Sequence, residues 1–142
     1  MRLHLRVLQV ATLAIAIGGC GRVQGSEGVK KMIVYYFPIG AETLTPITSA
    51  SIQERGRHCE IRSSGDIGKI KRVLHDAAKP TSQKFSDSAV RVKLLEASSE
   101  SERLLAVIEN EGEVRFSDGT ERQISSRGLE TLKKVIESQC RQ

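Results

Sequence analysis

The spacing of the apolar residues changes partway along the chain, and this change limits the folds that are open to it. Between residues 67 and 78 apolar side chains recur every three or four positions, as on one face of a helix. Beyond Phe85 they alternate with polar ones, as in Ala89-Val-Arg-Val-Lys-Leu94, which is typical of a half-buried strand. These patterns together predict an α+β domain with helices packed on one face of a mostly antiparallel sheet.

The expected order is strand, helix, strand, helix, four strands, helix. Strands are predicted over 32–37, 57–62, 89–94, 103–108, 113–117 and 120–124. Helices are predicted over 49–55, with Thr48 as N-cap and Gly56 as its end, over 67–78, and from Ser125-Ser126 to Cys140. The run 32–37 is apolar on both faces, as a central strand would be. Asp118-Gly119 is a hairpin signal, which makes 120–124 a short edge strand.

The first twenty residues have the pattern of an export signal. Arg2 and Arg6 precede a mostly apolar run from Val7 to Ile17, and the small residues Gly18 and Gly19 follow it. This run is shorter than the roughly 20 residues that a spanning helix needs. A cleaved secretory signal over residues 1–19 is therefore favoured over an uncleaved membrane anchor.

The sequence Ile17-Gly18-Gly19-Cys20 resembles the lipobox of bacterial lipoproteins. The resemblance covers only the export segment, and it implies that Cys20 becomes the lipidated first residue of the mature protein. Multiple acyl chains on one cysteine would hold the protein at a membrane surface. Because Gly21 rather than Asp follows Cys20, the resemblance implies the periplasmic face of the outer membrane in a two-membrane host. The alternative is an incidental cysteine near an ordinary cleavage site.

The mature chain is divided into residues 20–29, a lipidated cysteine with a flexible tether, and 30–142, a single globular domain. Loss of residues 1–19 removes Arg2 and Arg6 and no acid, which lowers the formal charge from +5 to +3. With no Trp and few aromatic residues, this mild basicity does not indicate nucleic-acid binding.

Cys59 and Cys140 are the two cysteines that remain after Cys20. In an oxidising compartment they are predicted to form a disulfide bond, and free buried thiols are the alternative. A loop of this length would stabilise the fold by roughly 4.5 kcal/mol in the chain-entropy description.

The sequence offers no recognisable catalytic, metal or cofactor site. His58, Cys59 and His75 lack metal-ligand spacing, and the two adjacent strand residues point to opposite faces. Ser63-Ser64-Gly65 lacks the frame of a hydrolase nucleophile and is explained by a helix cap. We therefore expect no catalytic residues, no metal and no cofactor.

Basic residues gather on the predicted second helix. Lys69, Arg72 and Lys79 are the candidate partner-binding residues, and the wider cluster adds Lys71, Lys84, Arg91 and Lys93. Such a surface could meet an acidic protein, lipid headgroups or another anionic envelope polymer. The alternative is an ordinary solvated helix face.

Together these observations predict a small non-enzymatic envelope lipoprotein that binds another macromolecule. One specific form is an inhibitor or immunity protein of an exported enzyme such as a cell-wall hydrolase. The alternatives are a hydrolase with an unrecognised site and a structural component of an envelope assembly.

Overall fold

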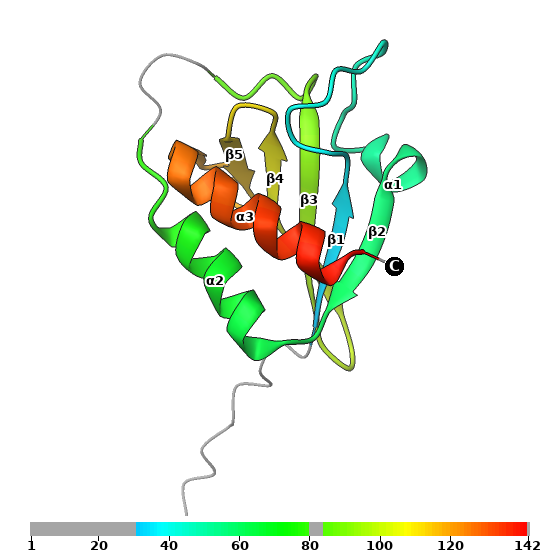
Figure 1. Ribbon diagram of the computed structural model, residues 1–142, viewed down its shortest axis with the longest axis vertical. Helices are drawn as coiled ribbons and strands as arrows, with labels where there is room; N and C mark the ends of the chain where they lie inside the picture. The colour runs from blue at the N-terminus through cyan, green and yellow to red at the C-terminus, as the bar shows by residue number, and fades with distance from the viewer. Residues whose placement is uncertain (1–30, 80–83, 142) are drawn as a thin grey trace, which may run out of the picture.

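The computed structural model describes residues 31–79 and 84–141. Their strands form one antiparallel sheet in the order β2-β1-β3-β4-β5-β6, and two long helices cover one of its faces (Figure 1). The elements are β1 (Lys31–Tyr36), α1 (Ile52–Arg55), β2 (Arg57–Ile61), α2 (Ser64–His75), β3 (Val90–Ala97), β4 (Glu102–Glu109), β5 (Glu113–Phe116), β6 (Glu121–Gln123) and α3 (Ser126–Gln139). The predicted α+β class and the predicted order of the elements are confirmed.

The apolar run at the start of the domain lies inside the sheet, as its two apolar faces predict. β1 pairs with β2 on one side and with β3 on the other. Met32 and Val34 face the long helices, whereas Ile33 faces the opposite side. All three side chains are buried, which explains why no polar residue interrupts this strand.

The main core lies between the sheet and the two long helices. Ile70 and Leu74 of α2 and Leu132 and Ile136 of α3 pack against it. The sheet contributes buried residues from five strands, namely Met32, Val34, Ile61, Val92, Leu94, Ala106, Ile108 and Val114. This core fixes α3 across the strands and so determines what its last turns can reach.

A second, smaller core lies on the other face of the sheet. Ile52 of α1 and the buried Ile47 and Phe85 pack there against Val90 and Val107. The short helix α1 therefore covers the face of the sheet opposite to the one that α2 and α3 cover. The placement of helices on one face holds for the two long ones.

The helix ends agree with the serine signals, but α1 and α2 depart from the predicted bounds. α2 begins at Ser64 rather than at 67, directly after its cap Ser63. Ser63 and Ser125 accept backbone hydrogen bonds at the starts of α2 and α3. α1 begins at Ile52 rather than near residue 49, although Thr48 makes the contacts of a cap: its hydroxyl accepts from the Ser51 amide at 3.1 Å, and its carbonyl accepts from the Ile52 amide at 3.0 Å. α2 ends at His75 rather than at 78, because Ala78 is extended and exchanges two backbone hydrogen bonds with Gln123.

Within the described residues, none of the helices has both the length and the apolar character needed to cross a membrane. The export segment and Cys20 lie outside the described residues.

Candidate binding site

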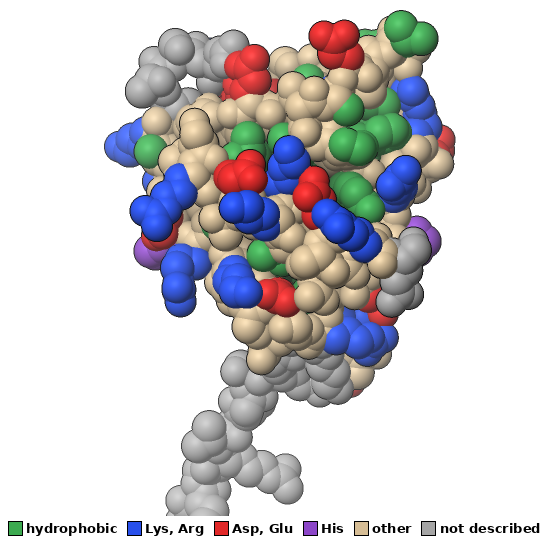
Figure 2. All heavy atoms as spheres, viewed as in Figure 1, with side chains coloured by type: hydrophobic (Ala, Val, Ile, Leu, Met, Phe, Trp, Pro, Cys, Tyr) green, Lys and Arg blue, Asp and Glu red, His purple; other side chains and the backbone are tan. Residues whose placement is uncertain are grey.

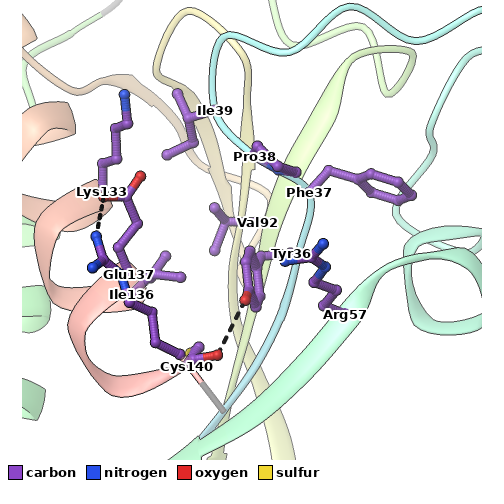
Figure 3. A pocket seen from close by; sticks show the side chains of 11 residues that line it. Tyr36, Phe37, Pro38, Ile39, Arg57, Val92, Lys133, Ile136, Glu137 and Cys140 are labelled. Carbon is purple, nitrogen blue, oxygen red and sulfur yellow. Dashed lines mark hydrogen bonds and ion pairs between the residues drawn. The ribbon is translucent and has the colours of Figure 1, made fainter.

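A pocket of about 410 Å³ opens between the end of β1 and the last turns of α3, and we call it the C-terminal pocket (Figure 3). Its lining residues are Tyr36, Phe37, Pro38, Ile39, Arg57, Val92, Lys133, Ile136, Glu137, Cys140 and Arg141.

Two segments that are far apart in sequence build the walls of this pocket. β1 ends at Tyr36, and Phe37, Pro38 and Ile39 continue from it as one wall. Lys133, Ile136, Glu137 and Cys140 form the other wall, because positions three, four and seven apart share one face of a helix. The Tyr36 hydroxyl donates a hydrogen bond to the Cys140 carbonyl at 3.5 Å and so links the two walls.

The disulfide bond between Cys59 and Cys140 fixes the end of α3 to β2. The two Cα atoms are 5.5 Å apart, and 81 positions separate the residues in the sequence. The predicted pairing is confirmed. Because Cys140 also lines the C-terminal pocket, the bond that stabilises the fold also positions a wall of the candidate site.

The C-terminal pocket has an apolar floor and a mostly cationic rim. Val92 and Ile136 are buried at its base. Arg141 lies 3.9 Å from Glu137, whereas Arg57 and Lys133 form no ion pair with any residue that the structure describes. In Figure 2 apolar side chains gather beside the C-terminal half of α3, with basic ones around them. Such a site favours an apolar group that carries negative charge next to it.

The predicted basic surface is only partly formed. Lys69 and Arg72 line one groove of about 420 Å³ between α2 and α3, where Arg127 and Thr131 join them. Lys69 is paired with Asp66 at 2.7 Å, and this hydrogen bond holds the pKa of the Asp66 carboxyl below its usual range. Lys79 is exposed beyond the end of α2 and does not line this groove.

The wider basic cluster expected from the sequence does not form. Lys71 pairs with Glu96 at 2.6 Å instead of remaining available. Arg91 is buried, and burial lowers the pKa of its guanidinium. Lys93 donates to the Ser49 carbonyl and to Gln53, on the face of the sheet that α1 covers. Lys93 alternates with Val92 and Leu94 of the main core and so lies on the face opposite α2, whereas Arg91 is buried at an irregularity in the pairing of β3 with β4.

Glu96 is the most enclosed carboxylate among the ion pairs found in the described residues, with 5% of its side chain exposed. Burial alone would raise its pKa, but hydrogen bonds and charge from Lys71 and Arg103 outweigh burial and lower it. Both carboxylate oxygens have a partner, since Oε1 meets Lys71 and Oε2 meets Arg103. This cluster ties α2 to the sheet and is a structural feature.

The histidines and acids do not form a metal centre in the part of the chain that the structure describes. No three side chains of the His, Cys, Asp and Glu types gather there in a suitable arrangement. His58 is exposed on β2, with its ring centroid 5.8 Å from that of Tyr35. His75 is exposed at the end of α2 beside Asp76.

The C-terminal pocket is not evident from the sequence. Phe37 is the end of the predicted strand over 32–37, and Ile136 and Cys140 lie in the predicted last helix. The one available signal was the disulfide, which brings Cys140 next to a strand that pairs with β1. The positions of Lys133 and Arg57 at the rim depend on the crossing of α3 over the sheet, which spacing does not reveal.

No protein-family model, curated protein or solved structure matches this chain.

Proposed function

We propose that this chain is a small non-catalytic envelope lipoprotein that works as a binding module, with the C-terminal pocket as its binding site. Its ligand is an apolar side chain on a macromolecule, flanked by acidic residues. The observation that carries this proposal is the apolar floor of the pocket beneath Arg57 and Lys133, two basic residues without an ion-pair partner among the described residues.

The physical reason is that the two parts of the pocket recognise different features of one ligand. Burial of an apolar side chain supplies most of the affinity, since it removes apolar surface from water. The basic rim raises the association rate and rejects cationic segments. A partner segment with both features is typical of a protein ligand, as in the complex of an inhibitor with its enzyme.

Only the sequence supports the proposed location in the cell envelope. The apolar run from Val7 to Ile17 and the lipobox-type sequence before Cys20 support export and acylation. An anchor on Cys20 followed by a tether would leave the pocket free to meet proteins near the membrane. An inhibitor or immunity protein of an exported enzyme remains the specific form of this proposal.

The proposal is tested with blocked peptides of defined chemistry on isotope-labelled processed protein. Acetyl-Asp-Phe-Asp-amide should shift the NMR signals of the Phe37–Ile39 wall and of the last two turns of α3. Acetyl-Asp-Ala-Asp-amide lacks the apolar group, and acetyl-Lys-Phe-Lys-amide reverses the charge, so both should bind several-fold more weakly. Equal binding of all three peptides, or shifts confined to other surfaces, would contradict the proposal.

Two matched charge reversals compare the C-terminal pocket with the basic groove of the second helix. Arg57→Glu with Lys133→Glu should abolish the preference for the acidic peptide. Lys69→Glu with Arg72→Glu makes the same change in net charge at the other surface and should leave that preference intact. The opposite result would assign binding to the groove between α2 and α3.

A further inference from the structure

Leu44 is a large apolar side chain that is wholly exposed at the tip of a loop. Among the described residues Leu104 is the other large hydrophobic side chain that is exposed, and about a third of its surface is accessible. The loop follows the Phe37–Ile39 wall of the C-terminal pocket and rises beyond the end of the sheet (Figure 1). Because single exposed apolar residues are common on protein surfaces, Leu44 points to a partner only together with the anchoring of its loop and the chemistry of the C-terminal pocket.

The loop is held in place on both sides of its tip. Arg91 donates from Nη2 to the Ala41 carbonyl at 2.8 Å, and the Gly40 amide donates to Asn110 Oδ1 at 2.7 Å. On the other side, Arg55 donates to the Pro46 carbonyl and to the Thr45 hydroxyl, the latter at 2.6 Å. Anchoring of this kind lowers the entropy that the loop would lose when Leu44 is bound.

The tip of this loop matches the C-terminal pocket in chemistry. Glu42 is exposed two positions before Leu44, so the tip carries one acid beside one apolar side chain. The pocket offers an apolar floor under Arg57 and Lys133. Its volume of about 410 Å³ is ample for a leucine side chain. Leu44 is fully exposed in its own chain, so it does not occupy the pocket that it would fit.

We propose that a second copy of this chain is the partner, with Leu44 of each copy in the C-terminal pocket of the other. Glu42 then lies at the partner's basic rim. Because the loop and the pocket belong to one chain, a two-fold exchange satisfies both copies and closes the assembly as a dimer. This inference rests on the proposed function, since it names the ligand of the same pocket.

The area involved is small, because each copy contributes one loop tip and one pocket. Such contacts give weak association in dilute solution. Tethering at a membrane surface would raise the local concentration and favour the dimer without any new contact. The experiments must therefore include one in the envelope as well as one in solution.

The first experiment uses the full chain in cells, with the photocrosslinking amino acid benzoylphenylalanine in place of Leu44. Illumination should give a covalent dimer, and mass spectrometry should place the bond in the partner's Phe37–Ile39 or 133–141 segments. The same amino acid in place of Thr120, exposed next to the Asp118-Gly119 turn, is the control and should give no dimer. Absence of a dimer, or crosslinks only to a different protein, would overturn self-association.

The second experiment measures the dimer dissociation constant of the processed protein by sedimentation equilibrium. Leu44→Asp should weaken the dimer at least about tenfold, as expected for the loss of a central apolar anchor. Glu42→Lys and Lys133→Glu should each weaken it, and their combination should restore it, because the swapped charges attract again. All these residues are on the surface, and circular dichroism checks that each variant is folded. Equal dissociation constants for all variants would overturn the inference.

The two proposals fail in different ways. If acetyl-Asp-Phe-Asp-amide binds the C-terminal pocket but Leu44→Asp leaves the sedimentation unchanged, self-association is wrong and the proposed function stands. If the pocket binds no peptide and the crosslinks avoid it, both are wrong. Dissociation of the dimer by that peptide would support both.

Discussion

Two glycines show how the surroundings of a single Cβ decide the sign of a substitution. At Gly56 a Cβ would lie 2.6 Å from the Ile52 carbonyl oxygen and 3.1 Å from that of Tyr36, so backbone atoms must shift. At Gly68, inside α2, a Cβ would have no neighbouring atom within 4 Å. The same change, glycine to alanine, is therefore expected to have opposite effects at the two positions.

We expect Gly68→Ala to stabilise the protein by about 0.5–1 kcal/mol, because alanine loses less backbone entropy in a helix. Gly56→Ala should destabilise it by about 1–3 kcal/mol through the forced contact. Urea unfolding of the two variants beside the unchanged protein measures both free energies. Stabilisation by Gly56→Ala would contradict the close packing between α1 and the end of β1.

Glu96 makes the stability of the fold depend on pH under acidic conditions. The folded state holds its pKa below the ordinary value of 4.5, so the unfolded chain takes up the proton first as the pH falls. The contribution of ionised Glu96 to the free energy of unfolding is fully present above about pH 4.5. It is lost as the pH falls through the lower pKa that Glu96 has in the folded state. The free energy of unfolding should therefore decrease on acidification below pH 4.5.

Glu96→Gln should remove part of this decrease and lower stability near pH 7 by about 2 kcal/mol, less than for a fully buried pair because Lys71 and Arg103 are partly solvated. Glu60→Gln is the matched control, since Glu60 also meets two basic residues, Lys31 and Arg62, but at an exposed position. Its effect should be much smaller. Urea unfolding from pH 7 to pH 3 compares the variants, and equal losses would contradict the structural role of Glu96.

At the scale of the elements, local chemistry determines most of the fold. Period-two alternation predicted β3 and β5, an apolar run predicted β4, and the serines before α2 and α3 are their caps. The predicted end of the second helix is wrong because a long-range contact outweighs local helix preference there. Ala78 pairs with Gln123, and α2 therefore ends before it. The face covered by α1 also depends on a distant contact, because Ile52 packs with Phe85 on the far side of the sheet.

The disulfide bond joins two elements that otherwise share few contacts, β2 and the end of α3. Replacing Cys59 and Cys140 together by serine should lower the free energy of unfolding by about 4 kcal/mol, since the bond closes a long loop. It should also speed amide exchange in the last turns of α3, next to the C-terminal pocket. Denaturant unfolding and hydrogen exchange measure the two effects.

A reducing agent provides the control for this prediction. It should bring the unchanged protein close to the stability of the double-serine variant and should not affect that variant. Two reactive thiols in the unchanged protein under oxidising conditions would contradict the bond. This pairing was predicted from the export signal and the cysteine count, because only two cysteines remain once Cys20 is assigned to the lipobox.

At the scale of the whole molecule, the candidate site was less predictable than the fold. Net charge and helix spacing drew attention to Lys69 and Arg72, which do share a groove. The C-terminal pocket instead requires residues from β1, β2 and α3 to meet, and only the packing of α3 across the sheet brings them together. An apolar floor in such a place has the same sequence pattern as ordinary core, which is why sequence reasoning did not separate the two.

The tethering of the whole molecule gives the last prediction. If Cys20 is acylated, Cys20→Ser should abolish incorporation of a labelled fatty acid and leave a larger, unprocessed precursor, because the residue that accepts the lipid is gone. The variant with Cys59 and Cys140 both replaced by serine keeps Cys20 and should still incorporate label, which makes it the matched control. Labelling in cells followed by gel electrophoresis measures both outcomes. Normal acyl incorporation in Cys20→Ser would contradict Cys20 as the acylated residue. Absence of label from the unchanged protein would remove the lipid anchor, and with it the rise in local concentration that favours the weak dimer at the membrane.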